Sequence, residues 1–131
     1  MTEMEIKEQI CDVCHKMWQL GWVAANDGNV SVKLPDGNFI GTPTGIRKSF
    51  ITPEKLVKIN AQGEILEAND GYRPSSEMKM HMRCYELRDD VGAVVHAHPP
   101  AATGFAVAHL PMDRYIMIEA VISLGSVPLT P

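Results

Sequence analysis

Two histidines stand one residue apart in the apolar run Val94–Pro99. Side chains two positions apart on a β-strand point to the same face, so His96 and His98 would present two imidazoles to one side. Neutral imidazole is a common ligand of zinc, and two such ligands with a carboxylate and an open position make a catalytic metal site. A histidine pair at a strand end can also be ordinary hydrogen-bonded surface. The pair by itself leaves both interpretations open.

Three turns built from small residues could bind an anion. Each offers backbone N–H groups at a tight bend, and the last precedes a predicted helix, whose N-terminus favours negative charge. Such turns are also common in loops and at helix caps, so none is decisive alone. Together they could form a cradle for a phosphate, because the attraction of amides is local and directional even in an acidic protein. The cradle residues would be Gly28, Asn29, Thr44, Gly45, Ser75 and Ser76.

The composition is that of one globular domain. The chain has 131 residues, of which 45% are hydrophobic and 21% charged, enough for a sizeable core. Its formal net charge of -4 offers no broad basic field for nucleic acid or a membrane surface. No apolar run approaches the ~18 residues of a spanning helix. The acidic N-terminus, with Glu3, Glu5 and Glu8, lacks the features of a signal peptide, so we expect a cytoplasmic protein.

The chain has three cysteines, and two of them, Cys11 and Cys14, form a C-x-x-C motif. This motif could serve redox chemistry, but no second pair completes a zinc knuckle. The apolar residues around it recur at helical intervals. The spacing therefore favours burial of both cysteines on the inner face of a helix.

Periodicity and turn signals predict a mixed order of helices and strands without internal repeats. Ser75 or Ser76 would cap the central helix, and Pro99-Pro100 would start the next one. The chain stops after Val127–Pro131 without a closing element, so we expect the C-terminal part of the fold to be missing. The predicted helices cover residues 4–21, a short turn after Thr52-Pro53, 78–87 and 100–108, and the predicted strands cover 30–34, 39–40, 57–60, 65–66, 93–98 and 115–118.

Four motifs in order resemble the class II aldolase/adducin family. They are Gly28–Ser31, Thr42–Ile46, Pro74–Glu77 followed by His81, and Val94–His98. The resemblance implies an α/β fold in three layers (α-β-α), with a central, mostly antiparallel sheet flanked by helices. Residues 1–131 would form a single domain of this type, corresponding to about its N-terminal two thirds. The family resemblance also implies one Zn²⁺ per subunit and a homotetramer with sites near the interfaces.

Carried over residue by residue, the resemblance makes His96 and His98 zinc ligands and Glu77 the acid/base carboxylate, which could also approach the metal. It makes the three turns the phosphate cradle. The implied reaction is the reversible cleavage of a phosphorylated ketose to dihydroxyacetone phosphate and an aldehyde. Zinc would act as a Lewis acid and stabilise an enediolate, so that no Schiff-base lysine is needed.

The resemblance leaves alternatives within the family. Related epimerases usually carry aspartate where Glu77 stands, which favours the aldolase branch, while other members are dehydratases, decarboxylases or non-catalytic adducin-like scaffolds. The family's third zinc histidine has no counterpart here, because His109 is too close in sequence to the His-x-His motif. The family's C-terminal tyrosine is absent as well. We expect a truncated chain to explain both departures.

Overall fold

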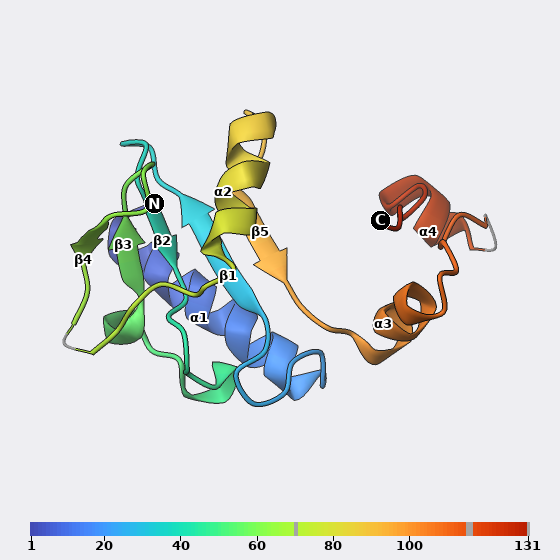
Figure 1. Ribbon diagram of the computed structural model, residues 1–131, viewed down its shortest axis with the longest axis horizontal. Coiled ribbons are helices and arrows are strands. Elements are labelled where there is room, and N and C mark those ends of the chain that lie inside the picture. Colours follow the sequence, from blue (N-terminus) through green and yellow to red (C-terminus); the bar gives the residue numbers. More distant parts are fainter. Residues whose placement is uncertain (70, 115–116, 131) are drawn as a thin grey trace. The chain divides into compact units, whose positions relative to one another are not determined.

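The computed structural model describes residues 1–69, 71–114 and 117–130, which form two compact units, Met1–His98 and Pro99–Pro131 (Figure 1). The second contains two helices, α3 (Pro100–Val107) and α4 (Ile118–Ser123). The first contains the helices α1 (Glu3–Gln19), η1 (Lys48–Phe50), η2 (Pro53–Lys55) and α2 (Met78–Leu87), and the strands β1 (Asn29–Lys33), β2 (Phe39–Gly41), β3 (Val57–Ile59), β4 (Ile65–Glu67) and β5 (Ala93–His96).

The five strands form one antiparallel sheet in the order β4-β3-β2-β1-β5. Four of them follow chain order, but β5 comes from far along the sequence and pairs with β1. In this pairing Asn29 lies opposite His96, and Ser31 lies opposite Val94. The register thus brings the first predicted turn of the cradle next to the histidine motif.

One face of the sheet packs against α1, which lies behind the strands in Figure 1. Val30 and Ile40 point to this face and share a buried cluster with Ile10 and Cys14 of α1. Cys11 is also buried, so both cysteines lie on the inner face of the helix as the spacing predicts. Burial raises the pKa of the Cys11 thiol to about 11 and that of Cys14 to about 12.

The other face packs against α2. Phe39 and Ile59 alternate with the residues of the first face and join Met78 and Tyr85 of α2 in a second buried cluster. The rings of Phe39 and Tyr85 lie 5.0 Å apart between their centroids. The predicted three-layer α-β-α arrangement with a mostly antiparallel sheet is therefore confirmed.

The first helix begins with a capping box. The Thr2 hydroxyl accepts from the Glu5 amide, and the Glu5 carboxylate accepts from the Thr2 amide. The helix ends at Gln19, two residues before the predicted Gly21, which has the left-handed φ of +69° expected of a glycine after a helix.

Other predicted boundaries also differ from the structure. The N-cap of α2 is Glu77 rather than Ser75 or Ser76, because the Ser75 hydroxyl accepts from the Glu77 amide and closes a turn just before the helix. Strand β5 ends at His96, since the His98 amide leaves the ladder and donates to the Trp22 carbonyl. Of the predicted strand at 115–118, Tyr115 and Ile116 lie outside the described residues, and Ile118 begins α4.

None of the helices in the described part of the chain combines the length and apolar character needed to cross a membrane.

Candidate metal and phosphate site

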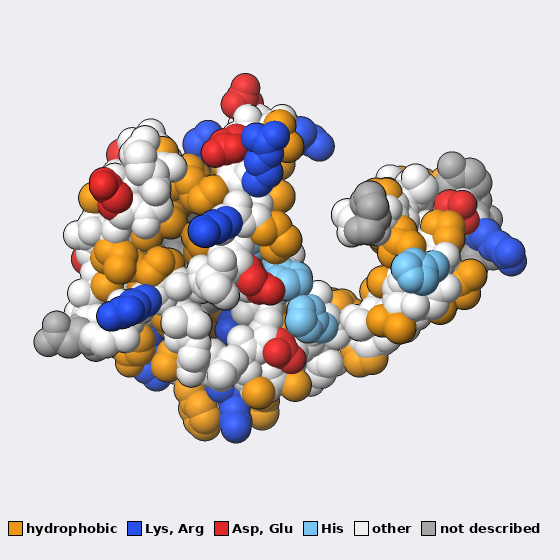
Figure 2. Space-filling model, in the orientation of Figure 1, with side chains coloured by type: hydrophobic (Ala, Val, Ile, Leu, Met, Phe, Trp, Pro, Cys, Tyr) orange, Lys and Arg blue, Asp and Glu red, His pale blue; other side chains and the backbone are white. Residues whose placement is uncertain are grey.

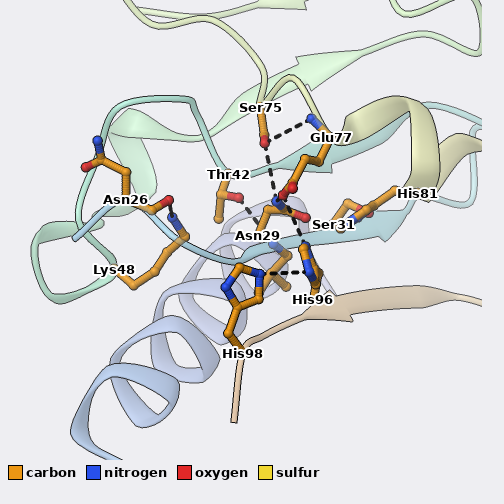
Figure 3. Close-up of polar contacts among 11 residues, drawn as sticks. Asn26, Asn29, Ser31, Thr42, Lys48, Ser75, Glu77, His81, His96 and His98 are labelled. Carbon is orange, nitrogen blue, oxygen red and sulfur yellow. Dashed lines mark hydrogen bonds and ion pairs between the residues drawn. The ribbon is translucent and has the colours of Figure 1, made fainter. Parts of the chain in front are cut away.

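The two predicted histidines meet although only His96 belongs to the strand. Their Nε2 atoms lie 3.1 Å apart, and the Glu77 carboxylate lies 3.1 Å from His96 Nδ1 (Figure 3). Glu77 comes from the start of α2, so two distant segments build this group. Histidine and acidic side chains also lie side by side on the surface of the first unit in Figure 2.

The two imidazoles fit a shared ion. Nitrogen atoms bound to zinc at about 2.0–2.1 Å in a tetrahedron lie roughly 3.3 Å from each other, close to the observed 3.1 Å. When Glu77 accepts a proton from His96 Nδ1, the lone pair of that ring is on Nε2, the atom that faces His98. Among residues 1–69, 71–114 and 117–130, however, no cluster of three or more histidine, cysteine or acidic side chains could hold an ion alone.

Glu77 is held on two sides. Asn29 donates its side-chain amide to the Glu77 carboxylate and, at 3.4 Å, to the Ser75 hydroxyl. Burial raises the pKa of Glu77, but the hydrogen bond from Asn29 and the interactions with His96 and His98 outweigh it. The pKa of Glu77 is therefore below its ordinary value, and at neutral pH the group is a carboxylate that can accept a proton.

Gly28 and Asn29 enter the site from the buried start of β1. Gly28 has a φ of +69° and lies so close to the His96 carbonyl that a Cβ atom would stand 2.7 Å from its oxygen. Asn29 is fully buried, and its side-chain oxygen has no partner among the described residues. The close approach of Gly28 to the His96 carbonyl and the pairing of Asn29 with His96 therefore place the first cradle turn directly beside a predicted metal ligand.

The other two cradle turns lie against each other. Pro43 and Pro74 form an isolated bridge, the Thr44 amide donates to the Arg73 carbonyl, and the Ser75 amide donates to the Thr42 carbonyl. These amides are thus already used within the protein. In these two turns the hydroxyls and the amides of Gly45 and Ser76 are the groups that a phosphate could engage.

A buried polar network beside the site was not assigned by sequence reasoning. His81 Nδ1 lies 2.7 Å from the Ser31 hydroxyl, and the Tyr85 hydroxyl donates to the Ser31 carbonyl at 2.9 Å. Burial and repulsion from His96, partly opposed by Glu77, lower the pKa of His81 to about 4, so its ring is neutral at pH 7. Two spacings could have revealed the network, since Ser31 shares a strand face with Asn29 and His81 lies one helical turn after Glu77.

The sequence profile of the Class II Aldolase and Adducin N-terminal domain family matches residues 8–131. The chain belongs to this family. It is 35% identical over its whole length to the L-fuculose phosphate aldolase of Escherichia coli O6:H1, of which it covers 59%. It is 41% identical over 88 residues, 67% of the chain and 42% of the relative, to the methylthioribulose-1-phosphate dehydratase of Gluconacetobacter diazotrophicus.

Solved class II aldolases share the fold. The crystal structure of the L-fuculose-1-phosphate aldolase of Thermus thermophilus superposes with a TM-score of 0.81 at 29% identity, covering 97% of this chain and 63% of that one. The chain thus spans about three fifths of the length of these two aldolases. Because the relatives carry out different reactions on sugar phosphates, similarity establishes the family but leaves the reaction open.

Proposed function

We propose that this chain carries the metal and phosphate sites of a zinc-dependent class II aldolase. The reaction would be the reversible cleavage of a phosphorylated ketose, L-fuculose 1-phosphate or a similar sugar, to dihydroxyacetone phosphate and an aldehyde. One observation carries the proposal: Glu77 lies between His96 of the histidine pair and Asn29 of the cradle. A single small substrate could therefore reach the metal, the carboxylate and the cradle at once.

In this proposal His96 and His98 hold the zinc ion, which supplies Lewis acidity toward the oxygens of the substrate. Glu77 takes or returns the proton at its carboxylate. Asn29 keeps that carboxylate oriented through its side-chain amide, and the same contact favours the ionised form that must act as a base. The hydroxyls of the cradle and the amides of Gly45 and Ser76 bind the phosphate.

Epimerase, dehydratase or decarboxylase activity on a related sugar phosphate is the alternative, and the dehydratase relative supports it. A non-catalytic, adducin-like scaffold is a further alternative, which the presence of His96, His98 and Glu77 in one group disfavours. The homotetramer and the cytoplasmic location stay predictions.

The metal is tested first. With a further ligand supplied by a neighbouring subunit, elemental analysis of the purified protein should find near-stoichiometric zinc, and the variant His96→Ala should lose it. His15→Ala is the matched control, because His15 lies on α1 and bonds the Ile51 carbonyl, outside the site. Zinc retained by His96→Ala, or cleavage of the sugar phosphate at full rate without metal, would refute the proposal.

The carboxylate is tested separately from the metal. Glu77→Gln should keep zinc but lower the release of dihydroxyacetone phosphate by about 10²–10⁴-fold, the usual contribution of general acid–base catalysis. Glu86→Gln is the control, since Glu86 lies on the exposed side of α2 in a pair with Arg83. Turnover of Glu77→Gln at the parental rate would remove Glu77 from the reaction. In that case another base must be sought.

A further inference from the structure

Lys48 is the largest side chain that is fully buried in the described part of the chain, with 1% of its surface exposed. Its ammonium group donates to the backbone carbonyl of Asn26 at 3.3 Å (Figure 3) and to that of Ile46 at 3.2 Å. No carboxylate of the described residues forms an ion pair with it. By contrast, Lys7 and Lys58 each form an ion pair with Glu3.

A buried cation without a carboxylate partner is costly. Burial lowers the pKa of Lys48, and the charges of Asp27 and Glu77 oppose that effect from a distance. Methionine would fill similar space without the desolvation cost, and replacing buried charges by apolar groups of the same volume is often neutral or stabilising. The hydrogen bonds to the two carbonyls offset part of the desolvation cost, but neutral donors could make them without burying a charge.

The position of the ammonium group suggests the reason. Asn26 stands two residues before Gly28, and Ile46 follows Gly45 directly. Lys48 thus joins the turn that carries Gly28 and Asn29 to the turn that carries Thr44 and Gly45. These are two of the three turns of the proposed cradle, and the cradle itself is built from neutral amides and hydroxyls next to the Glu77 carboxylate.

We propose that Lys48 is the positioning residue of the phosphate cradle. Its hydrogen bonds to the Asn26 and Ile46 carbonyls hold two of the turns in place, and its positive charge favours the binding of a doubly charged anion. The inference rests on the proposed function, because it takes the three turns as the phosphate site. It goes further in naming the group that offsets the charge of a dianion. A buried charge acts through a medium of low dielectric, so its influence reaches the cradle without direct contact.

The test compares Lys48→Met with the parent and with Lys16→Met, an exposed lysine of α1 that removes the same charge. The probe is inorganic phosphate at pH 8, titrated while the backbone amide resonances of Gly45 and Ser76 are followed by NMR. Lys48→Met should weaken phosphate binding by at least about tenfold, because at an effective dielectric constant near 20 a unit charge attracts a dianion by more than the ~1.4 kcal/mol of a tenfold change at any separation below ~20 Å. Lys16→Met should change it less than about twofold because solvent screens an exposed charge.

A second titration separates charge from loop geometry. Sulfate and perchlorate are tetrahedral oxoanions that carry two charges and one charge, respectively. Because Coulomb energy is proportional to charge, Lys48→Met should lower the ratio of sulfate to perchlorate affinity by at least about threefold. Equal weakening of both anions would mean that Lys48 only orders the turns, and the proposal would be wrong.

The parent chain provides a measurement that does not depend on a folded variant. Addition of phosphate should shift the ¹⁵Nζ resonance of Lys48, and an unchanged resonance at saturating phosphate would overturn the inference. A parent that binds no phosphate would overturn the cradle of the proposed function as well. If the parent and Lys48→Met bind phosphate equally, only the role of Lys48 is refuted.

Discussion

Gly28→Ala should destabilise the first unit more than an alanine placed in any open turn. The new Cβ would lie 2.5 Å from Val23 Cγ1 and 2.7 Å from the His96 carbonyl oxygen. The second contact is with backbone, which cannot turn aside as a flexible side chain does. Left-handed φ costs an alanine roughly 1–2 kcal/mol, and overpacking a buried position adds about 1–3 kcal/mol. We expect a total loss of about 2–5 kcal/mol.

Gly37→Ala is the matched control. Gly37 also has a left-handed φ, +83°, but no atom lies within 4 Å of the position that its Cβ would take. It should therefore lose only the backbone contribution of about 1–2 kcal/mol. Urea unfolding followed by the fluorescence of Trp18 and Trp22, which lie in the first unit, measures both variants.

The same variant tests the link to the metal site. Relief of the clash must move the His96 backbone or the turn before β1, so Gly28→Ala should also weaken zinc binding, whereas Gly37→Ala should not. Equal losses of stability in the two variants would refute the argument from the close approach of Gly28 to His96. A Gly28→Ala protein with parental stability would show that the turn adapts without cost.

Two further predictions follow from buried titratable groups. The pKa of His81 is about 4 in the folded chain, below the ordinary 6.5. As the pH falls, His81 is therefore protonated first in the unfolded chain, and the folded state loses stability between about pH 6.5 and pH 4. Urea unfolding should show a loss of about 2 kcal/mol from pH 7 to pH 5, and a flat profile would contradict the burial of a neutral ring. Because burial raises the pKa of Cys11 and Cys14, an aromatic disulfide reagent at pH 8 should modify the partly exposed Cys84 in the folded chain and the other two only in denaturant. Rapid reaction of all three thiols would show that the inner face of α1 opens.

Local patterns predicted most of the elements. The first helix, the two strands on either side of Gly37 and the central helix each depend on residues close in sequence, such as apolar residues at helical spacing or a turn glycine. Boundaries were missed where a long-range contact decides them. Strand β5 ends early because the His98 amide finds the Trp22 carbonyl, and no pattern near His98 encodes that partner.

The sequence by itself determined which groups are present: two imidazoles at strand spacing, a carboxylate after two serines, and turns rich in amides. Only the tertiary structure decided how they meet. The pairing of β1 with β5 sets Asn29 opposite His96, and the packing of α2 on the sheet brings Glu77 to both and closes the network of Ser31 and His81. The tertiary structure also buries Lys48, which bonds one carbonyl in each of two turns. The reason is physical, since strand register and helix packing follow from contacts between segments far apart in the chain, whereas caps, turns and periodicity act within a few residues.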